Sequence, residues 1–587
     1  MSKYTYSNIP KVYINRSVHD LSFGHKTTMN VGDLVPIYCD FWYPGSTFKM
    51  DATFVSRTLN SFIKPVMDNM FIDIRFFSVP VRLLYDKFED MFGKGDPDDW
   101  TADSKGPIEL PKFVFTARTA EETKKFLGSL PDYFGDIPCG TPISAGLAVS
   151  QLPYRAYAKV YNDWYRDENF EYPVVYKSST LDNGVTVGTA PAVFGVNNIF
   201  NAYPAKVAKF HDRFTSSLPA PQKGSEVNLP IGGTAPLKVI SGPPYDVGGN
   251  IRFSDTNGYQ DSGSPFFANS GGGLAVMSGE VDSTQRKWIY NTVDGNISTG
   301  HYITNLSAVS TGSAVSTGAV VPITRTNLSA DLTNATAASV NDLRFAFQLQ
   351  KQLERLARGG SRYTEYIQSA FGVTSGDARL QRSEFLGGRR TPLNVQQVAQ
   401  TSSSTDTSPL GDVGAYSLSS GRSGCIKSFT EHSVVIGLAC IRYFHTYQQG
   451  IPAWHRRLRR VDLYDPVFST IGEQPVMKTE LYVGAGKDEI FGYQEAWSDL
   501  RRKENVVSGA LRTGSGANLD FWHFGDNYAN APTLNAQFIK ENPENLNRTL
   551  AFDITPQTPP FILDFWFNQT GYLPLPAYSV PSLIDHH

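Results

Sequence analysis

The residue types best suited to chemistry gather at 442–460, where the sequence RYFHTYQQGIPAWHRRLRR contains five arginines and no Asp or Glu. Guanidinium groups contact phosphates, and aromatic rings offer faces on which bases stack. Proteins that bind single-stranded nucleic acid without sequence preference combine the two. The alternative is that these arginines bind carboxylates of a neighbouring protein, because Arg is enriched at interfaces. The first interpretation predicts a DNA contact at six residues: Trp454, His455, Arg456, Arg457, Arg459 and Arg460.

A second basic stretch, 343–390, is a weaker candidate for the same contact. It holds four acidic residues and nine basic ones, which are Arg344, Lys351, Arg355, Arg358, Arg362, Arg379, Arg382, Arg389 and Arg390. Phosphate contacts at either stretch should weaken steeply as salt is added, because binding releases counterions from the nucleic acid.

Catalytic and metal-binding patterns are not recognisable in this sequence. The segment VGAGKDEI at 483–490 has Leu481 in place of the first glycine of a phosphate loop and Asp488 in place of its Ser or Thr, so a tight turn is the better interpretation. The histidines at 432, 445, 455 and 523 lack the spacing of a zinc site. We therefore predict no catalytic residue, no cofactor and no metal.

Composition indicates a mainly β protein that buries much of its surface. The 587 residues are 41% hydrophobic, 13% aromatic and only 19% charged. Few charges and many large rings suit burial in a core or against neighbouring subunits. Fifty glycines and 36 prolines predict many turns between short strands. The net charge of −3 excludes a polycation that coats nucleic acid along its whole length.

The chain shows no sign of export or membrane insertion. Its N-terminal sequence has no apolar core of a signal peptide, and no apolar run reaches transmembrane length. The four cysteines, at 39, 139, 425 and 440, are sparse and predict thiols in a reducing compartment. We therefore expect the protein to be made and assembled in a cytoplasm, without inserting into a membrane.

Hydrophobic periodicity predicts several elements. Residues 70–77 alternate as a strand does, and 433–444 and 561–576 are apolar enough for buried strands. Residues 152–170 predict a helix with aromatic residues at helical spacing, which we interpret as a core face rather than a ligand platform. A further helix is expected to start after Ser339 and to end at the glycine pair 359–360.

Composition changes abruptly at residue 225. Residues 225–340 carry 13 charged residues and 15 glycines, with a short tandem repeat, AVSTGS then AVSTGA, at 308–319. Two interpretations remain open: an ordered β-rich insertion that projects from the main domain, or a flexible loop. We expect three parts: 1–224 as the first part of the body with an N-terminal arm, 225–340 as a surface insertion, and 341–587 as the second part of the body.

Several sequence blocks resemble the major capsid protein of gokushoviruses, small single-stranded-DNA phages of the Microviridae. Among these blocks are FFSVPVRLLYDKFEDMFG at 76–93, LPYRAYAKVYNDWYRDENF at 152–170, GGSRYTEYIQSAFGVTSGDARLQRSEFLGG at 359–388, EHSVVIGLACIRYFHTYQQGIP at 431–452 and VPSLIDHH at 580–587. The blocks are collinear and cover most of the chain outside the insertion. This makes the resemblance specific.

The resemblance implies a mainly β fold: an eight-stranded viral jelly roll with long inserted loops and a few helices. It implies a T=1 icosahedral shell of identical subunits, located in the virion, around a circular single-stranded DNA genome. The insertion at 225–340 would form a protrusion at the threefold axes that meets a host receptor. A small basic DNA-binding virion protein and a pilot protein are the implied partners.

Two other functions fit a β-rich chain of this size. The first is a bacterial cell-surface or secreted carbohydrate-binding β-protein, and the second is an enzyme such as a glycan depolymerase. Both would be expected to carry a signal peptide or a recognisable pair of catalytic acids. Neither feature is visible in the sequence.

Overall fold

A computed structural model of the chain describes residues 15–91, 108–182, 185–186, 188–224, 340–358, 381–401, 410–517 and 519–578, together with short strands between 237 and 330. The chain divides into two compact units. One unit combines Met1–Gly224 with Leu353–His587, and the other is Ser225–Gln352.

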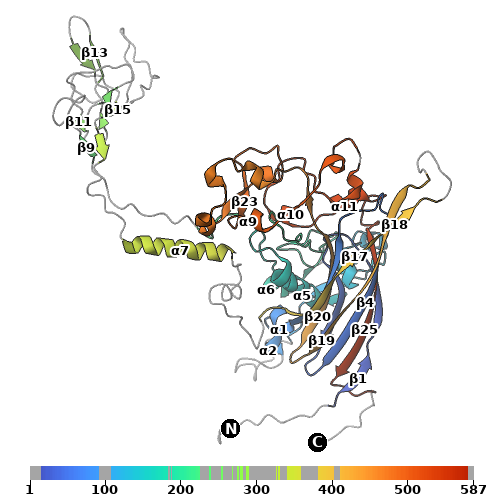
Figure 1. Cartoon of the computed structure of the whole chain (residues 1–587). Coiled ribbons are helices and arrows are strands. Elements are labelled where there is room, and N and C mark those ends of the chain that lie inside the picture. The colour runs from blue at the N-terminus through green and yellow to red at the C-terminus, as the bar shows by residue number, and fades with distance from the viewer. Residues whose placement is uncertain are drawn as a thin grey trace, which may run out of the picture. The chain divides into compact units, whose positions relative to one another are not determined.

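Two antiparallel sheets form the body of the first unit. One sheet has six strands in the order β1-β25-β4-β19-β18, with β2 also paired to β25, and the other has four strands in the order β17-β5-β20-β3. Figure 1 shows the long strands lying side by side. The bounds are β1 Ser17–Asp20, β2 Phe23–Met29, β3 Val35–Trp42, β4 Thr47–Thr58, β5 Met70–Pro80, β17 Glu384–Leu393, β18 Val395–Ala399, β19 Val413–Ser428, β20 Ser433–Tyr443 and β25 Phe561–Leu573.

The strand order is that of a jelly roll. Four strands of the larger sheet, β2-β25-β4-β19, lie opposite the four strands β3-β20-β5-β17. Taken in chain order, these eight strands alternate between the two sheets except at β5 and β17, which lie in the same sheet. The expected mainly β, eight-stranded jelly roll is therefore confirmed. Long connections follow β5 (residues 81–383) and β20 (residues 444–560), and they hold most of the described helices.

Side chains of the two sheets meet in one apolar core. Inward positions alternate along β4 and β25, where Phe48, Met50, Phe54, Phe565 and Phe567 are all buried. They pack in the same cluster as Ile72, Ile74 and Phe76 of β5. Alternation with period two is what a sheet with one face on the core and one face toward solvent requires.

The central strand β20 is buried on both faces. Its residues alternate between two clusters: Val434, Ile436 and Leu438 face the layer that contains α5, whereas Val435 and Ile441 face the core between the sheets. Because both faces are covered, the strand is an almost continuous apolar run. The strands predicted at 70–77, 433–444 and 561–576 are confirmed as β5, β20 and β25.

The predicted aromatic helix is shorter than expected. Helix α5 spans Leu152–Val160, a π-helical turn follows at Tyr161–Tyr165, and Arg166 is extended. The Arg166 side chain donates to the Glu171 carbonyl at 2.7 Å, which holds the chain in its turn away from the helix. The core interpretation of the aromatic face is confirmed, since Tyr154, Tyr157 and Tyr161 are buried. The Tyr157 hydroxyl donates to the Leu34 carbonyl at 2.7 Å.

The remaining elements of the first unit are short and lie in the two long connections. In 81–383 they are α1 Val81–Leu84, α2 Phe88–Met91, β6 Lys112–Val114, α3 Ala120–Lys124, α4 Leu130–Phe134, β7 Ala148–Ser150, α6 Ser179–Asp182 and β8 Val185–Thr186. In 444–560 they are β21 Thr446–Tyr447, η5 Ala453–Arg456, η6 Arg460–Asp462, η7 Pro466–Thr470, β22 Gln474–Met477, η8 Lys478–Glu480, β23 Ile490–Gln494, α9 Ser498–Arg501, β24 Asn505–Val506, η9 Gly509–Leu511, η10 Asp520–Trp522, α10 Ala536–Ile539 and α11 Glu544–Thr549.

The described strands of the second unit pair as short antiparallel ladders. They are β9 Leu237–Val239 with β16 Leu328–Ala330, β10 Phe253–Ser254 with β15 Arg325–Thr326, β11 Phe267–Ala268 with β12 Leu274–Ala275, and β13 Ser278–Val281 with β14 Arg286–Ile289. The tandem repeat at 308–319 lies outside the described residues. Helix α7, Val340–Arg358, confirms the helix predicted before the glycine pair.

Part of the predicted N-terminal arm belongs to the larger sheet. Strands β1 and β2 pair in succession with the two halves of β25, from Ser17 opposite Leu573 to Met29 opposite Phe561. Residues 1–14 lie outside the described residues, as do residues 359–380 of the second basic stretch.

Candidate functional site

The six residues predicted to contact DNA lie in the connection between β20 and β25. Trp454, His455 and Arg456 belong to the short helix η5, and Arg460 begins η6. Trp454 is 60% exposed, and its ring meets that of His455 edge-on with centroids 4.0 Å apart. The segment therefore places an aromatic face and an imidazole at the surface beside the arginines.

The four arginines have different surroundings. Arg457 is largely covered: its guanidinium binds the Asp499 carboxylate at 2.7 Å and lies 5.0 Å from the Trp497 ring centroid. Arg456 donates to the Lys487 carbonyl at 2.9 Å. Arg459, 77% exposed, binds Asp462 of its own turn at 2.9 Å, and Arg460 is exposed. Arg457 thus holds the 454–460 segment against Trp497 and Asp499, whereas Arg459 and Arg460 are exposed to solvent.

The second basic stretch is partly engaged within the chain itself. Arg358 binds the carboxylate of Glu473 at 2.7 Å, and Arg390 binds that of Asp73 at 2.8 Å. Arg390 also lies 4.3 Å from the Phe210 ring centroid. These two arginines therefore form ion pairs within the chain. Arg389, which precedes Arg390 on β17, is exposed.

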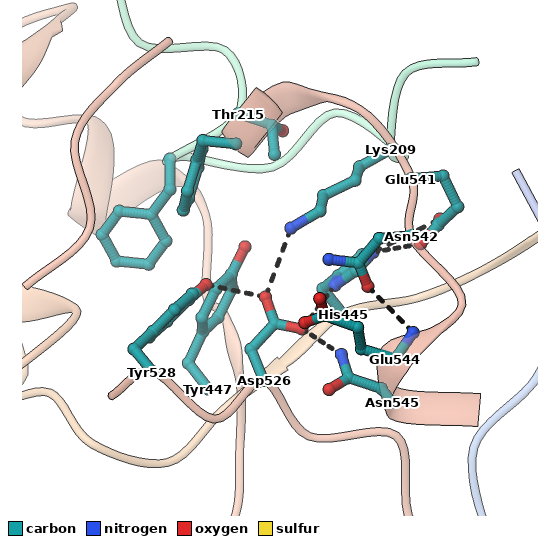
Figure 2. Close-up of polar contacts among 12 residues, drawn as sticks. Lys209, Thr215, His445, Tyr447, Asp526, Tyr528, Glu541, Asn542, Glu544 and Asn545 are labelled. Atoms are coloured by element: carbon teal, nitrogen blue, oxygen red, sulfur yellow. Dashed lines mark hydrogen bonds and ion pairs between the residues drawn. The ribbon is translucent and has the colours of Figure 1, made fainter. Parts of the chain in front are cut away.

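A buried polar network joins the 444–560 connection to Lys209 of the 81–383 connection (Figure 2). The two ring nitrogens of His445 meet carboxylates on both sides, Asp526 at 2.8 Å and Glu541 at 3.1 Å. Lys209 reaches the other Asp526 oxygen at 3.4 Å, and the Asn545 amide donates to Asp526 at 2.5 Å. The side chains of His445, Asp526 and Glu541 are at most 4% exposed.

The charges within this network shift the pKa values of His445 and Asp526. Burial alone would lower the pKa of His445, but the Asp526 and Glu541 carboxylates outweigh it and raise that pKa to about 9. Burial would raise the pKa of Asp526, yet the His445 and Lys209 cations hold it well below its usual range. The imidazole is therefore protonated at neutral pH between two anionic partners.

This arrangement is structural and not catalytic. Both nitrogens of the His445 ring are occupied by carboxylates, and all three side chains are buried, so a substrate has no access to them. What the network can do is hold the start of the connection, at β21, against α10 and α11. Breaking such a buried, satisfied network leaves an unpaired charge, which is costly.

No sequence pattern predicts this network. Its members stand at 209, 445, 526 and 541, and no motif connects such distant positions. His445 lies in the basic stretch 442–460, and its spacing from the other histidines is not that of a zinc site. Within the described residues, no group of three or more His, Cys, Asp or Glu side chains is placed to hold a metal ion. The four thiols are free.

The part of the chain that the structure describes has no helix with the length and apolar character of a membrane span.

Comparison with known proteins identifies the family. The model of the phage capsid protein (F protein) family matches residues 7–583. The capsid protein VP1 of Spiroplasma virus 4 is 38% identical over 97% of this chain and 98% of its own length. The VP1 capsid proteins of Bdellovibrio phage phiMH2K and Chlamydia phage 1 are 35% and 34% identical, each over 99% of this chain and 98% of their own length.

These matches confirm the resemblance to the gokushovirus capsid protein over nearly the whole sequence. The family consists of structural shell proteins and not of enzymes, which agrees with a site region built from ion pairs and a buried network. The jelly roll, the full-length family match and the capsid relatives lead to one conclusion: this chain belongs to the phage capsid protein (F protein) family and is a major capsid protein of the virion.

Proposed function

We propose that this capsid protein assembles into a T=1 icosahedral shell that encloses a circular single-stranded DNA genome. The observation that carries the proposal is an eight-stranded jelly-roll body in a chain that matches the capsid relatives over 97–99% of its length. The double-sheet jelly roll is an architecture that viral capsid subunits use.

The exposed part of the 454–460 segment is proposed to contact the genome. Trp454 offers a stacking face, and Arg459 and Arg460 offer guanidinium groups to phosphates. Arg457 is assigned a different task, because Asp499 and Trp497 already occupy it. His455 and Arg456 complete the proposed surface.

The experiment compares particles of the wild type with those of the triple variant Arg456→Gln, Arg459→Gln, Arg460→Gln, which keeps Arg457 in place. We expect shells of normal diameter by electron microscopy and a reduced ratio of DNA to protein in purified particles. The matched control neutralises two exposed lysines elsewhere, Lys124→Gln with Lys125→Gln. Equal DNA content in the triple variant would refute the contact at this segment, and particles without single-stranded DNA in the wild type would refute the shell proposal.

The insertion 225–340 is proposed to form the threefold surface protrusion that meets a host receptor, between the two parts of the body at 1–224 and 341–587. Its low charge and its small polar residues suit an exposed module that carries little of the hydrophobic core. A small basic DNA-binding virion protein and a pilot protein are proposed as further virion partners. A basic protein would supply the positive charge that this chain, with a net charge of −3, lacks.

A further inference from the structure

The outward face of the larger jelly-roll sheet carries a groove that the proposed function does not use. The groove has a volume of about 720 Å³, which lies within the usual range of ligand sites, roughly 300–1,000 Å³. Six of its lining residues matter for the argument: Gly24, Lys26, Arg389, Arg422, Asp564 and Trp566. They come from β2, β17, β19 and β25.

Trp566 lies at the centre of this face. It is 54% exposed, and in the sheet register Gly24 stands opposite it on β2 and Thr53 on β4, with Arg422 of β19 opposite Thr53. A Cβ atom at Gly24 would lie 3.5 Å from the indole ring. Because glycine has no side chain, this flank of the ring is left open, and the indole presents a free surface.

The charge around the ring is positive although the chain as a whole is negative. Outward positions of β2, β4, β19 and β25 carry four basic side chains and two carboxylates, which are Lys26, Lys49, Arg57 and Arg422 against Asp51 and Asp564. Exposed Arg389 adds a further cation at the groove. Lys26 lies 3.6 Å from Asp564, but its side chain is 79% exposed and can also reach an anion. Arg422 forms a two-point ion pair with Asp51.

An exposed indole surrounded by cations selects a particular ligand class. Single-stranded nucleic acid offers a flat base to the ring and phosphates to the basic groups, and this recognition needs no sequence specificity. An acidic peptide would use the cations and leave the indole without a stacking partner. A second copy of this chain carries a net charge of only −3 over 587 residues, far less negative charge than the phosphates of a nucleic acid supply.

We propose that this groove is a single-stranded nucleic-acid site, in which a base stacks on Trp566 and the adjoining phosphates bind Lys26 and Arg389. The proposal rests on the proposed function, since it needs a shell that encloses single-stranded DNA. It adds a second contact surface, built on a sheet instead of a loop, and it orients that sheet face toward the genome.

The test measures binding of a fluorescent thymidine oligonucleotide to purified full-length protein over a range of salt concentrations. Trp566→Ala should weaken binding by at least about fivefold through lost stacking, and Trp566→Phe should retain most of the affinity. Gly24→Val should weaken binding without a change of charge, because the valine side chain would cover the Trp566 ring. Arg389→Gln should lower the slope of log affinity against log salt by roughly 0.7.

One variant is expected to act in the opposite direction. Asp564→Asn removes the carboxylate beside Lys26 and should tighten binding, an effect that damage to the fold would not produce. The control is Tyr172→Ala, which removes a highly exposed aromatic ring in the 81–383 connection and should leave the affinity unchanged.

The outcomes separate the two proposals. Unchanged affinity in Trp566→Ala and Asp564→Asn, with single-stranded DNA present in native particles, would overturn the groove and leave the shell proposal standing. Native particles free of single-stranded DNA would overturn the shell proposal itself. Weaker binding in Trp566→Ala together with equal competition by poly-glutamate would assign the groove to an acidic protein segment and also overturn it.

Discussion

At the scale of single residues, His445 makes the stability of the protein depend on pH. The folded protein raises its pKa from 6.5 to about 9, so the imidazolium contributes fully below about pH 6.5 and its contribution is lost as the pH rises through 9. Asp526, whose pKa is lowered, contributes above about pH 4 and is lost in stronger acid. The network therefore stabilises most between about pH 4 and 6.5.

We predict that the free energy of unfolding falls by roughly 3 kcal/mol between pH 6 and pH 10 through this one group. Urea unfolding of the unassembled full-length chain at both pH values measures the change. His445→Gln should be less stable at pH 6 and should lose most of this pH dependence, whereas His455→Gln, at an exposed site, should behave as the wild type. An identical pH profile in His445→Gln and wild type would contradict the prediction.

The residue scale is also where sequence-based prediction reaches its limit. The arginine segment is visible because its residues are adjacent, but the Lys209–Asp526 and His445–Glu541 contacts join positions that only the folded chain brings together. The groove around Trp566 was missed for the same reason. Its cations are single residues on different strands, so no local cluster marks them in the sequence.

At the scale of elements, strand β20 depends on close packing at one glycine. Gly437 lies between β3 and β5, opposite Tyr38 and Phe76. An added Cβ atom would stand 2.7 Å from the Phe76 ring and 3.0 Å from the Tyr38 Cβ. Neighbours on both sides are buried in the core, so they have little room to move.

Gly437→Ala is therefore predicted to destabilise the protein by about 1–3 kcal/mol through overpacking. Thermal or urea unfolding measures the loss. The control is Gly195→Ala, where an added Cβ meets no atom within 4 Å and the unfolding free energy should stay nearly constant. Equal stability of the two variants would show that β3 and β5 can separate to admit a methyl group.

Elements with one dominant period were predictable from the sequence, and their exact ends were not. The alternation of 70–77 and the apolar run of 433–444 identify β5 and β20, because a strand in the middle of a jelly roll must bury one face or both. The end of α5 was missed. It depends on the π-helical turn and on the bond from Arg166 to Glu171, which the aromatic spacing does not encode.

At the scale of the whole molecule, the body should not need the insertion to fold. All members of the three apolar clusters among the described residues belong to the unit formed by Met1–Gly224 and Leu353–His587. Removing a segment that contributes nothing to these clusters should leave the free energy of unfolding of the body nearly unchanged.

We predict that a variant with residues 230–335 replaced by a short Gly-Ser linker still forms particles and no longer attaches to host cells. Electron microscopy measures the shells, and a cell-adsorption assay with wild-type particles as reference measures attachment. Loss of particles would show that the insertion takes part in assembly, and normal adsorption would remove its proposed role in attachment.

The pairing of the first strand with the last, Ser17 opposite Leu573, has a practical consequence. Strands β1 and β25 are antiparallel neighbours, so a short peptide from Leu573 to Ser17 can join them as a hairpin. The subunit is therefore suited to circular permutation, in which new ends are opened in a surface loop. Such a permuted subunit would let a cargo or an epitope be displayed from a chosen loop while the strand order of the body stays intact.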